Sequence, residues 1–475
     1  MVDDLVETAL DFDQQSNMES ALHRRLDSLV RHLVPPQSAS QDLTKNPLNI
    51  TASGSDSVSA SPVLIGGMVL DIHAKPYNDL APRTTNPGEK ASGFVRFDCL
   101  MVDAHSMLLC FDRNLLSSGF DFVATHSCFN RKPMQVQYAS GGVARNIAEC
   151  MCKLGARPFM ISVVGLDMAG EMLLRYWKSA GLSTEGILQE KSIATPVVTN
   201  IFDSYGELAA GVASVDAVEK FLTPYFVQQF QSYICSAPVL LLDANLHPQS
   251  LEFACRIAAG SGIPVWFEPV SVKKSTRISS IVNYITYASP NEIELIAMAN
   301  SLLPEKEFKF QLDHNGSKMH SVESLFQMLK PAISFVLCKG IKCLVVTLGQ
   351  AGVFLCFRDW LQCKIQDLKS SKLASLSSMP HAIVDEGQLG VEFQAYHFPA
   401  LNSSVVNPTG AGDCLVAGVI ASICSGLDLM RSVAIGIAVA KAAVESKINV
   451  PAEFNMKDLA GGAESILSGV KHLLV

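Results

Sequence analysis

The chain has 475 residues, 48% of them hydrophobic and 17% charged, and a formal net charge of −8. This length and apolar content suffice for a large core, and for a domain of about 300 residues with additional segments. The acidic balance and the lack of a Lys/Arg-rich block argue against a nucleic-acid partner. Thirteen scattered cysteines without a Cys-x-x-Cys pair are typical of buried thiols in a reducing compartment, and no apolar run predicts a membrane span.

The N-terminal segment, residues 1–33, is mostly polar and carries one amphipathic patch at helical spacing. In this patch Arg25-Leu26, five intervening residues and His32-Leu33 resemble a type 2 peroxisomal targeting signal, which an import receptor reads. The alternative is an ordinary amphipathic surface helix of a cytoplasmic protein. We expect import into peroxisomes.

A flexible linker is expected next, because residues 34–60 are rich in Ser, Pro, Asn and Thr and poor in apolar residues. The organisation that follows is a targeting segment and linker over residues 1–60 and one folded domain over residues 61–475.

Within the folded domain, apolar β-rich runs alternate with helix-like segments. Strands are expected at 63–65, 159–164, 238–242, 264–267 and 343–347 and within 281–287, and helices at 251–259, 414–427 and 432–444. This alternation predicts an α/β fold with a doubly wound, mostly parallel sheet, and ligands at the carboxyl ends of its strands. A second, smaller β element is predicted where residues 195–201 and 208–213 alternate around a turn at 203–206.

A glycine-rich run near the C-terminus, NPTGAGD at 407–413, carries the clearest chemical signal. It lies between a β-rich run at 403–406 and the apolar helix expected at 414–427. A strand that turns through Gly-x-Gly into a helix exposes backbone N–H groups, which together with the helix dipole form an anion site. Asp413 at such a site can take a proton from an alcohol during phosphoryl transfer, although a capping aspartate is the simpler alternative.

A second glycine-rich element strengthens this interpretation. Gly141 and Gly142 open a predicted helix and allow a ligand to approach the backbone closely. Asn146 follows about one turn into that helix, on the side that faces its opening.

Segments 141–170 and 407–426 resemble the two signatures of the ribokinase-like (PfkB) carbohydrate kinases, and the resemblance extends over roughly residues 62–470. Within that family the wording is most similar to pseudouridine kinases; the matching stretches are GGVARNIAE at 141–149, DANL at 243–246 and EPVSV at 268–272. Val143 stands where ribokinases carry lysine, which argues against free ribose. Asn407 stands where they carry aspartate, so the need for a monovalent cation stays open.

The resemblance implies a role for each matching residue. The groups expected in catalysis are the base Asp413 and the anion-hole residues Gly410, Ala411 and Gly412. Those expected to hold the sugar are Asp71, at the end of the first strand, with Gly141, Gly142 and Asn146. Those expected at the nucleotide are Asn291, Thr347, Gly349, Gly352 and Thr409, with Asn291 and Glu294 reaching Mg²⁺ mainly through water.

The activity implied is ATP-dependent phosphorylation of the 5′-hydroxyl of pseudouridine. In the family, strands such as those near 72–140 and 195–215 form a lid over the sugar, which would exclude water, and exposed lid strands could pair into a homodimer. The alternatives are another nucleoside or sugar kinase of the same fold, or a non-catalytic binding protein derived from one.

Two segments are inserts in the family pattern. Residues 89–134 are either an elaboration of the lid or the product of a transcript or gene-model variant, and we favour the second interpretation. Residues 362–389 are polar and Ser-rich and predict a surface loop. Lys273 and Lys274 are expected to be a solvated pair rather than phosphate ligands.

Overall fold

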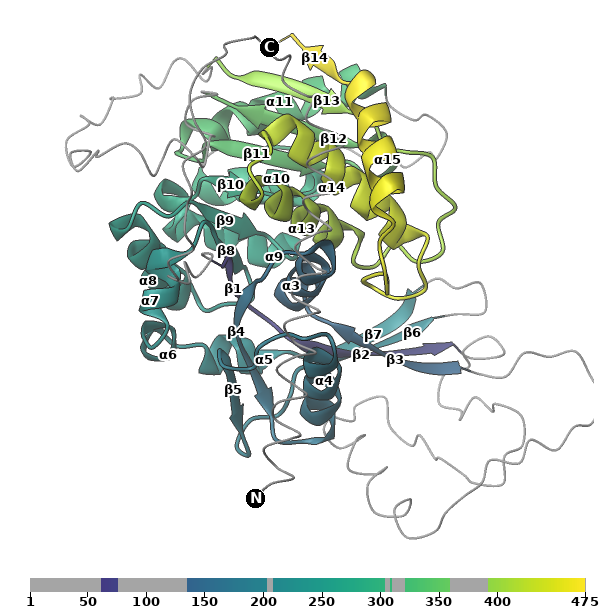
Figure 1. Ribbon diagram of the computed structural model, residues 1–475. Coiled ribbons are helices and arrows are strands. Elements are labelled where there is room, and N and C mark those ends of the chain that lie inside the picture. Colours follow the sequence, from purple (N-terminus) through teal and green to yellow (C-terminus); the bar gives the residue numbers. More distant parts are fainter. Residues whose placement is uncertain are drawn as a thin grey trace, which may run out of the picture.

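The computed structural model describes residues 61–75, 135–202, 208–303, 308–309, 321–358 and 392–474 (Figure 1). The predictions for the targeting segment and linker, for the turn at 203–206 and for the segments 89–134 and 362–389 therefore lie outside the described residues.

The core is a ten-stranded sheet with the strand order β14-β13-β12-β11-β10-β9-β8-β1-β4-β5. Its strands are β1 (Val63–Ile65), β4 (Phe159–Gly165), β5 (Ile187–Glu190), β8 (Leu240–Asp243), β9 (Val265–Glu268), β10 (Tyr287–Ala288), β11 (Cys343–Thr347), β12 (Val353–Phe357), β13 (Gln394–Phe398) and β14 (Lys471–Leu473). Neighbours from β11 to β5 pair in parallel, whereas β12, β13 and β14 add an antiparallel edge. The predicted α/β class with a mostly parallel sheet is confirmed.

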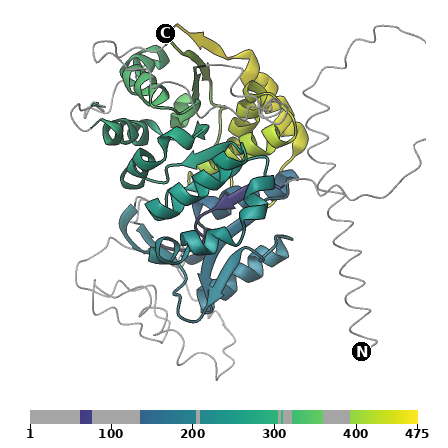
Figure 2. The same ribbon diagram turned by 90° about the vertical axis from the view of Figure 1, so that its left-hand side faces the viewer.

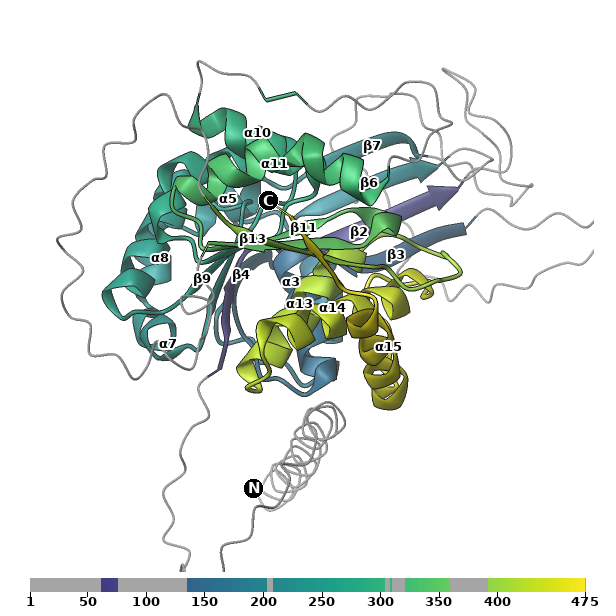
Figure 3. The same ribbon diagram turned by 90° about the horizontal axis from the view of Figure 1, so that it is seen from above.

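Helices cover both faces of this sheet (Figures 2 and 3). One face packs against α3 (Val143–Leu154), α4 (Met168–Ser179), α13 (Ala411–Cys424), α14 (Leu429–Val444) and α15 (Met456–Ser468). The other packs against α5 (Asp216–Phe221), α6 (Pro224–Gln228), α7 (Gln231–Ser236), α8 (Pro248–Gly260), α10 (Glu292–Leu302) and α11 (Val322–Cys338). Within the described ranges, no helix has the length and apolar content needed to cross a membrane.

The two apolar segments after the glycine-rich run form the buried helices α13 and α14, as predicted. They approach closely because both carry a glycine at the contact: a Cβ on Gly418 would lie 2.9 Å from the Cα of Gly436. This packing buries almost all of α13 beyond its first turn. The first turn of α13 is thereby held rigidly at the edge of the core, where the candidate site lies.

A separate four-stranded sheet, with the order β3-β2-β6-β7, projects from the core (Figure 1). Its strands are β2 (Val69–Lys75), β3 (Gln135–Gly141), β6 (Val197–Phe202) and β7 (Leu208–Ser214). β2 pairs in parallel with β6, and the outer pairs are antiparallel. This is the small β lid that the family resemblance implied, and β6 and β7 match the predicted second β element.

Two expected strands differ from the structure. Of the segment 281–287 only Tyr287 lies in a strand, the two-residue β10 that it forms with Ala288, because a 3₁₀ turn at Val282–Tyr284 occupies the middle of the segment. The segment 403–406 forms no strand. Val405 and Val406 are 56% and 55% exposed, and the N–H groups of Val406 and Asn407 both donate to the carbonyl of Val444, at 2.7 and 3.1 Å. The β-branched pair therefore runs along the end of α14 and has no strand partner.

Candidate active site

Asp413 lies in the first turn of α13, whose start is set by Gly410. Gly410 has φ +82°, and a Cβ there would lie 2.4 Å from a backbone carbonyl oxygen, so only glycine fits this turn. The N–H of Ala411 donates to Pro408 O at 3.3 Å, whereas no acceptor for the N–H of Gly412 or Asp413 is found in the described part of the chain. These two donors at a helix start can bind an anion.

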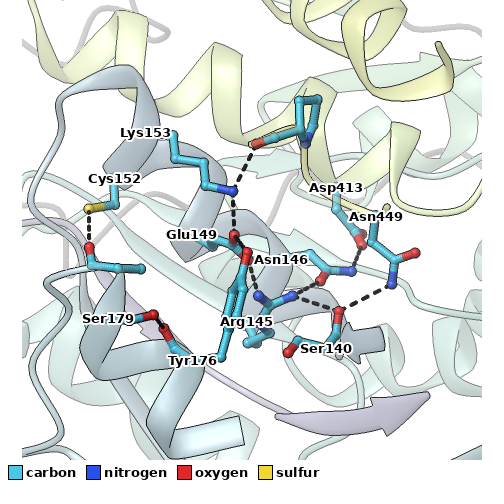
Figure 4. Close-up of polar contacts among 12 residues, drawn as sticks. Ser140, Arg145, Asn146, Glu149, Cys152, Lys153, Tyr176, Ser179, Asp413 and Asn449 are labelled. Carbon is cyan, nitrogen blue, oxygen red and sulfur yellow. Dashed lines mark hydrogen bonds and ion pairs between the residues drawn. The ribbon is translucent and has the colours of Figure 1, made fainter. Parts of the chain in front are cut away.

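Asn146 lies in the first turn of α3 and is 4% exposed. Its Nδ2 donates a 2.7 Å hydrogen bond to Oδ2 of Asp413 (Figure 4). α3 begins at Gly142, which has φ +98° and where a Cβ would lie 2.4 Å from the carbonyl oxygen of Gly67. The two glycine-rich motifs therefore meet at their helix starts, and this brings Asn146 and Asp413 together.

Asp71 is not at the end of the first strand, where it was expected. The chain leaves the core sheet after β1, and Asp71 is the third residue of the lid strand β2. Asn449 Nδ2 donates to Asp71 Oδ2 at 3.2 Å, and a Cβ on Gly141 would lie 2.1 Å from the same oxygen. Burial raises the pKa of Asp71. The lid therefore presents a partly desolvated carboxylate that is held from the core side by an amide.

Burial raises the pKa of Asp413 to about 7. The hydrogen bond from Asn146 and the charge of Arg145 oppose this rise, while the carboxylates of Asp243 and Asp71 add to it. A carboxylate whose pKa lies near the working pH is suited to accept a proton from an alcohol and to release it afterwards.

Asn291 and Glu294 are placed together at the start of α10, but as a reciprocal capping box. Asn291 Oδ1 accepts from the N–H of Glu294 at 2.9 Å, and Glu294 Oε2 accepts from the N–H of Asn291 at 3.0 Å. An Asn followed three residues later by Glu predicts this motif from sequence, so the capping role was readable beside the metal role. Burial raises the pKa of Glu294.

The remaining nucleotide-side candidates lie at neighbouring strand ends. Thr347 ends β11 and forms an isolated parallel bridge with Asn291. Gly349 follows with φ +54°, and no atom lies within 4 Å of where its Cβ would be. Gly352 has φ +96° and lies against β13, because a Cβ there would be 2.0 Å from a backbone carbonyl oxygen. Thr409 is exposed just before α13.

Glu268, at the end of β9, was not predicted as a site residue. Burial raises its pKa well above the usual range, and the carboxylates of Asp413 and Glu294 both add to this shift. Its side chain accepts a hydrogen bond from Ser289, which in turn accepts from the indole N–H of Trp266 at 2.7 Å. Glu268 therefore lies within electrostatic reach of both Asp413 and Glu294. The sequence signal was its place after a buried strand, in line with Asp243.

Lys274 corrects another expectation. It is partly buried rather than solvated, its Nζ donates to Asn245 Oδ1, and burial lowers its pKa. Lys273 is exposed, as expected. Asn245 follows β8 and its N–H donates to Asp243 at 2.9 Å, so Lys274 belongs to a polar cluster at the carboxyl ends of the strands.

Comparisons with known proteins identify relatives of the chain. The model of the pfkB family of carbohydrate kinases matches residues 109–359 and 370–449. The chain is 43% identical over 424 residues to a pseudouridine kinase of Arabidopsis thaliana, which covers 87% of this chain and 98% of that protein. It is 23% identical over 301 residues to a pseudouridine kinase of Escherichia coli (strain K12), covering 63% and 78% of the two chains.

Solved structures share the fold. Arabidopsis thaliana ribokinase complexed with ribose and ATP has a TM-score of 0.55 at 15% identity and covers 86% of this chain and 99% of its own. A nucleoside kinase of Methanocaldococcus jannaschii has a TM-score of 0.52 at 15% identity and covers 86% and 98%. At these identities the likeness speaks for the fold alone.

Proposed function

We propose, from the premise that this chain belongs to the pfkB family of carbohydrate kinases, that it transfers the γ-phosphoryl group of ATP to the 5′-hydroxyl of pseudouridine. Family membership makes it a phosphotransferase that acts on an alcohol group of a sugar or nucleoside. The choice of pseudouridine is supported by the likeness to pseudouridine kinases of a plant and a bacterium.

One observation carries the proposal: a partly desolvated carboxylate stands beside unpaired backbone N–H groups at a helix start. Asp413 accepts the proton of the nucleoside alcohol as the oxygen attacks phosphorus. The N–H groups of Gly412 and Asp413 face the negative charge that develops on the transferred group. The donors of the anion hole therefore differ from those inferred from Gly410, Ala411 and Gly412. The N–H of Ala411 is already engaged with the carbonyl of Pro408, and the N–H of Asp413 is available in its place.

The sugar is held from the lid side. Asp71 of β2 accepts hydrogen bonds from ribose hydroxyls, and Gly141 and Gly142 allow the sugar to approach the backbone. Asn146 contacts the general base Asp413 through Nδ2, in addition to holding the sugar. The lid sheet excludes water from the transfer and so suppresses hydrolysis of ATP.

The nucleotide side fits ATP with Mg²⁺. Among the described residues no group of three or more His, Cys, Asp or Glu side chains could enclose a metal. Asn291 and Glu294 would act as outer ligands of Mg²⁺, an ion that keeps several waters and binds phosphate oxygens. When bound, the ion supplies positive charge that neutralises the phosphates. Thr347, Gly349 and Gly352 line the nucleotide.

A substrate panel tests the proposal. Purine nucleosides, uridine, pseudouridine, ribose and fructose are each offered with Mg-ATP, and phosphorylated product is measured by mass spectrometry. Pseudouridine is expected to give the highest kcat/KM. A higher value for another acceptor would assign the chain to another nucleoside or sugar kinase, and no product from any acceptor would favour the non-catalytic alternative.

We also propose a homodimer formed through the lid. Among the described residues β3 and β7 are the edge strands of the lid sheet, and edge strands favour pairing with another strand. Light scattering of the purified protein tests this directly: a mass of one chain at micromolar concentration would oppose it.

A further inference from the structure

Arg145, next to Asn146 in α3, is only 2% exposed. A guanidinium withdrawn from water needs hydrogen-bond acceptors, and both terminal nitrogens of Arg145 have them. It forms an ion pair with Glu149 one turn further along, and its centre lies 5.3 Å from the ring centroid of Tyr176. Burial lowers the pKa of Arg145 to about 10, so it keeps its charge at neutral pH.

Glu149 anchors this arginine to two other elements (Figure 4). Its Oε1 accepts a 2.8 Å hydrogen bond from the hydroxyl of Tyr176 in α4 and lies 2.5 Å from Lys153 Nζ. Lys153 also donates to the carbonyl of Pro451 at 2.8 Å. These contacts fix Arg145 from the side that faces away from Asp413.

Nη2 of the guanidinium donates to Glu149, whereas Nη1 faces the site. Arg145 Nη1 donates to Asn146 Oδ1 and to the carbonyl of Ser140, both at 2.7 Å. An arginine can only donate, so it must face the oxygen end of the Asn146 amide. The NH₂ end is then turned to Asp413, whose Oδ2 must act as an acceptor. The proton from a substrate alcohol is thereby directed to Oδ1.

Ser140 lies in the lid strand β3, so the same nitrogen also touches the lid. Asn449 Nδ2 donates to the Ser140 carbonyl at 3.3 Å and to Asp71 at 3.2 Å. The lid strands β2 and β3 are therefore both held by residues that also lie around Asp413, the proposed general base.

We propose that Arg145 is a positioning residue for the general base: it fixes the Asn146 amide with its NH₂ end on Asp413 and links that amide to the lid through the carbonyl of Ser140. The inference rests on the proposed kinase function. Arg145 touches neither reacting atom in this arrangement, and its effect passes through Asn146.

A purely structural role for the buried ion pair is the competing explanation, and a double variant separates the two. Arg145→Met alone leaves Glu149 without its main partner and is expected to lower Tm. Arg145→Met combined with Glu149→Met removes both charges of this pair and keeps apolar volume, which often restores stability, while Lys153 keeps its hydrogen bond to the carbonyl of Pro451. The matched control is Arg175→Met with Glu171→Met, an exposed pair with the same spacing on α4.

The positioning role predicts that the double variant regains Tm but not turnover. We expect kcat to fall on the order of 10- to 100-fold, as for a slightly misplaced catalytic group, with KM for ATP changed little. The control pair should keep wild-type kcat. Recovery of both Tm and kcat in the double variant would overturn the proposal, whereas a wild-type protein that phosphorylates no acceptor would instead overturn the proposed function.

A measurement without substrate tests the positioning role independently of the proposed function. The groups that face Asp413 from other positions, namely Asp71, Asp243, Glu268 and Cys150, are all retained in the double variant. Losing the charge of Arg145 and the ordered Asn146 bond should raise the pKa of Asp413 further. The decline of Tm with rising pH should therefore extend to higher pH than in wild type; an unchanged Tm–pH curve would count against the inference.

Discussion

Asn146 and Asp413 are separated by 267 positions in the sequence, yet the amide of the first donates a 2.7 Å hydrogen bond to the carboxylate of the second. The bond joins the first turns of α3 and α13, the two helices that begin at glycine-rich motifs. It occupies Oδ2 of Asp413, and within the described residues no hydrogen bond to Oδ1 is found. The free oxygen is the one that can receive a proton from a substrate.

Replacing Asp413 by Asn removes the base while keeping the contact, because an amide oxygen still accepts from Asn146. We expect kcat to fall about 10²- to 10⁴-fold, the usual cost of losing a positioned base, with KM for ATP nearly unchanged. Steady-state kinetics with an ADP-detecting assay measures this. Asp458→Asn, the same chemical change in the exposed first turn of α15, serves as the control and should be silent. Near-full turnover by Asp413→Asn would remove the residue from the mechanism.

The pKa of Asp413, raised to about 7, gives activity and stability opposite pH dependences. Activity needs the carboxylate, so kcat/KM should rise as pH increases through about 7. Stability runs the other way, because the folded pKa lies above the unfolded value of 3.8 and the folded state binds the proton more tightly. The charged form therefore destabilises the fold increasingly between pH 4 and 7, by at most about 4 kcal/mol, since Asp413 keeps some solvent contact.

Thermal unfolding of wild type and Asp413→Asn across this pH range tests the second half. The variant should gain more in Tm at pH 8 than at pH 5. An equal gain at both values would mean that the carboxyl group has an ordinary pKa.

The positions of the parallel strands were readable from the sequence because each of them is a short apolar run between turn residues. Residues 63–65 and 343–347 coincide with β1 and β11. Asp71 was misplaced because the segment after β1 has the same β character whichever sheet it joins. Nothing local marks the point where the chain leaves the core sheet for the lid.

The site shows the same division between local and long-range signals. Gly142 was predicted as a helix opening, whereas Gly410 was placed in the turn before a helix expected at 414–427, and α13 in fact begins at Ala411. Positive φ and close backbone contacts select glycine at both positions. The roles of Asn449 and Glu268 were missed because their partners are distant in sequence, and only the packing of lid on core and of neighbouring strands brings them to the site. The strand expected at 403–406 was wrong for the opposite reason: Val406 has a local β preference, but the structure places no neighbouring strand beside it.

Peroxisomal import is predicted from Arg25-Leu26 and His32-Leu33. Residues 1–40 fused to a fluorescent reporter should give punctate fluorescence that coincides with a peroxisomal marker. Replacing Arg25 and His32 by Ala should disperse it. A diffuse signal from the unaltered fusion, insensitive to these replacements, would leave the protein cytoplasmic.

Deletion of residues 91–134 should preserve activity. Lys75 at the end of β2 and Gln135 at the start of β3 are directly paired in the lid, so a short connection can join them. Residues 76–90 would remain as the loop, and shortening a loop changes its closure entropy only slightly. Kinetics and Tm of the deletion variant check this; loss of activity in a folded variant would show that the segment is a functional part of the lid.

Gly410 and Gly412 are two residues apart but should respond to alanine in different ways. At Gly410 the positive φ and the 2.4 Å approach of a Cβ to the Asn449 carbonyl oxygen should cost about 2 kcal/mol or more in stability. At Gly412 a Cβ meets no atom within 4 Å, so the fold should keep its stability or gain up to about 1 kcal/mol from helix propensity. The added methyl group, however, stands at the helix start where the transferred phosphoryl group must lie, so kcat/KM should fall about 10-fold or more.

Gly461→Ala, an equally open position in α15, is the control for the propensity gain and should leave kcat/KM unchanged. If Gly412→Ala is as active as that control, the helix start is not the anion site, and the unpaired N–H groups there serve some other purpose.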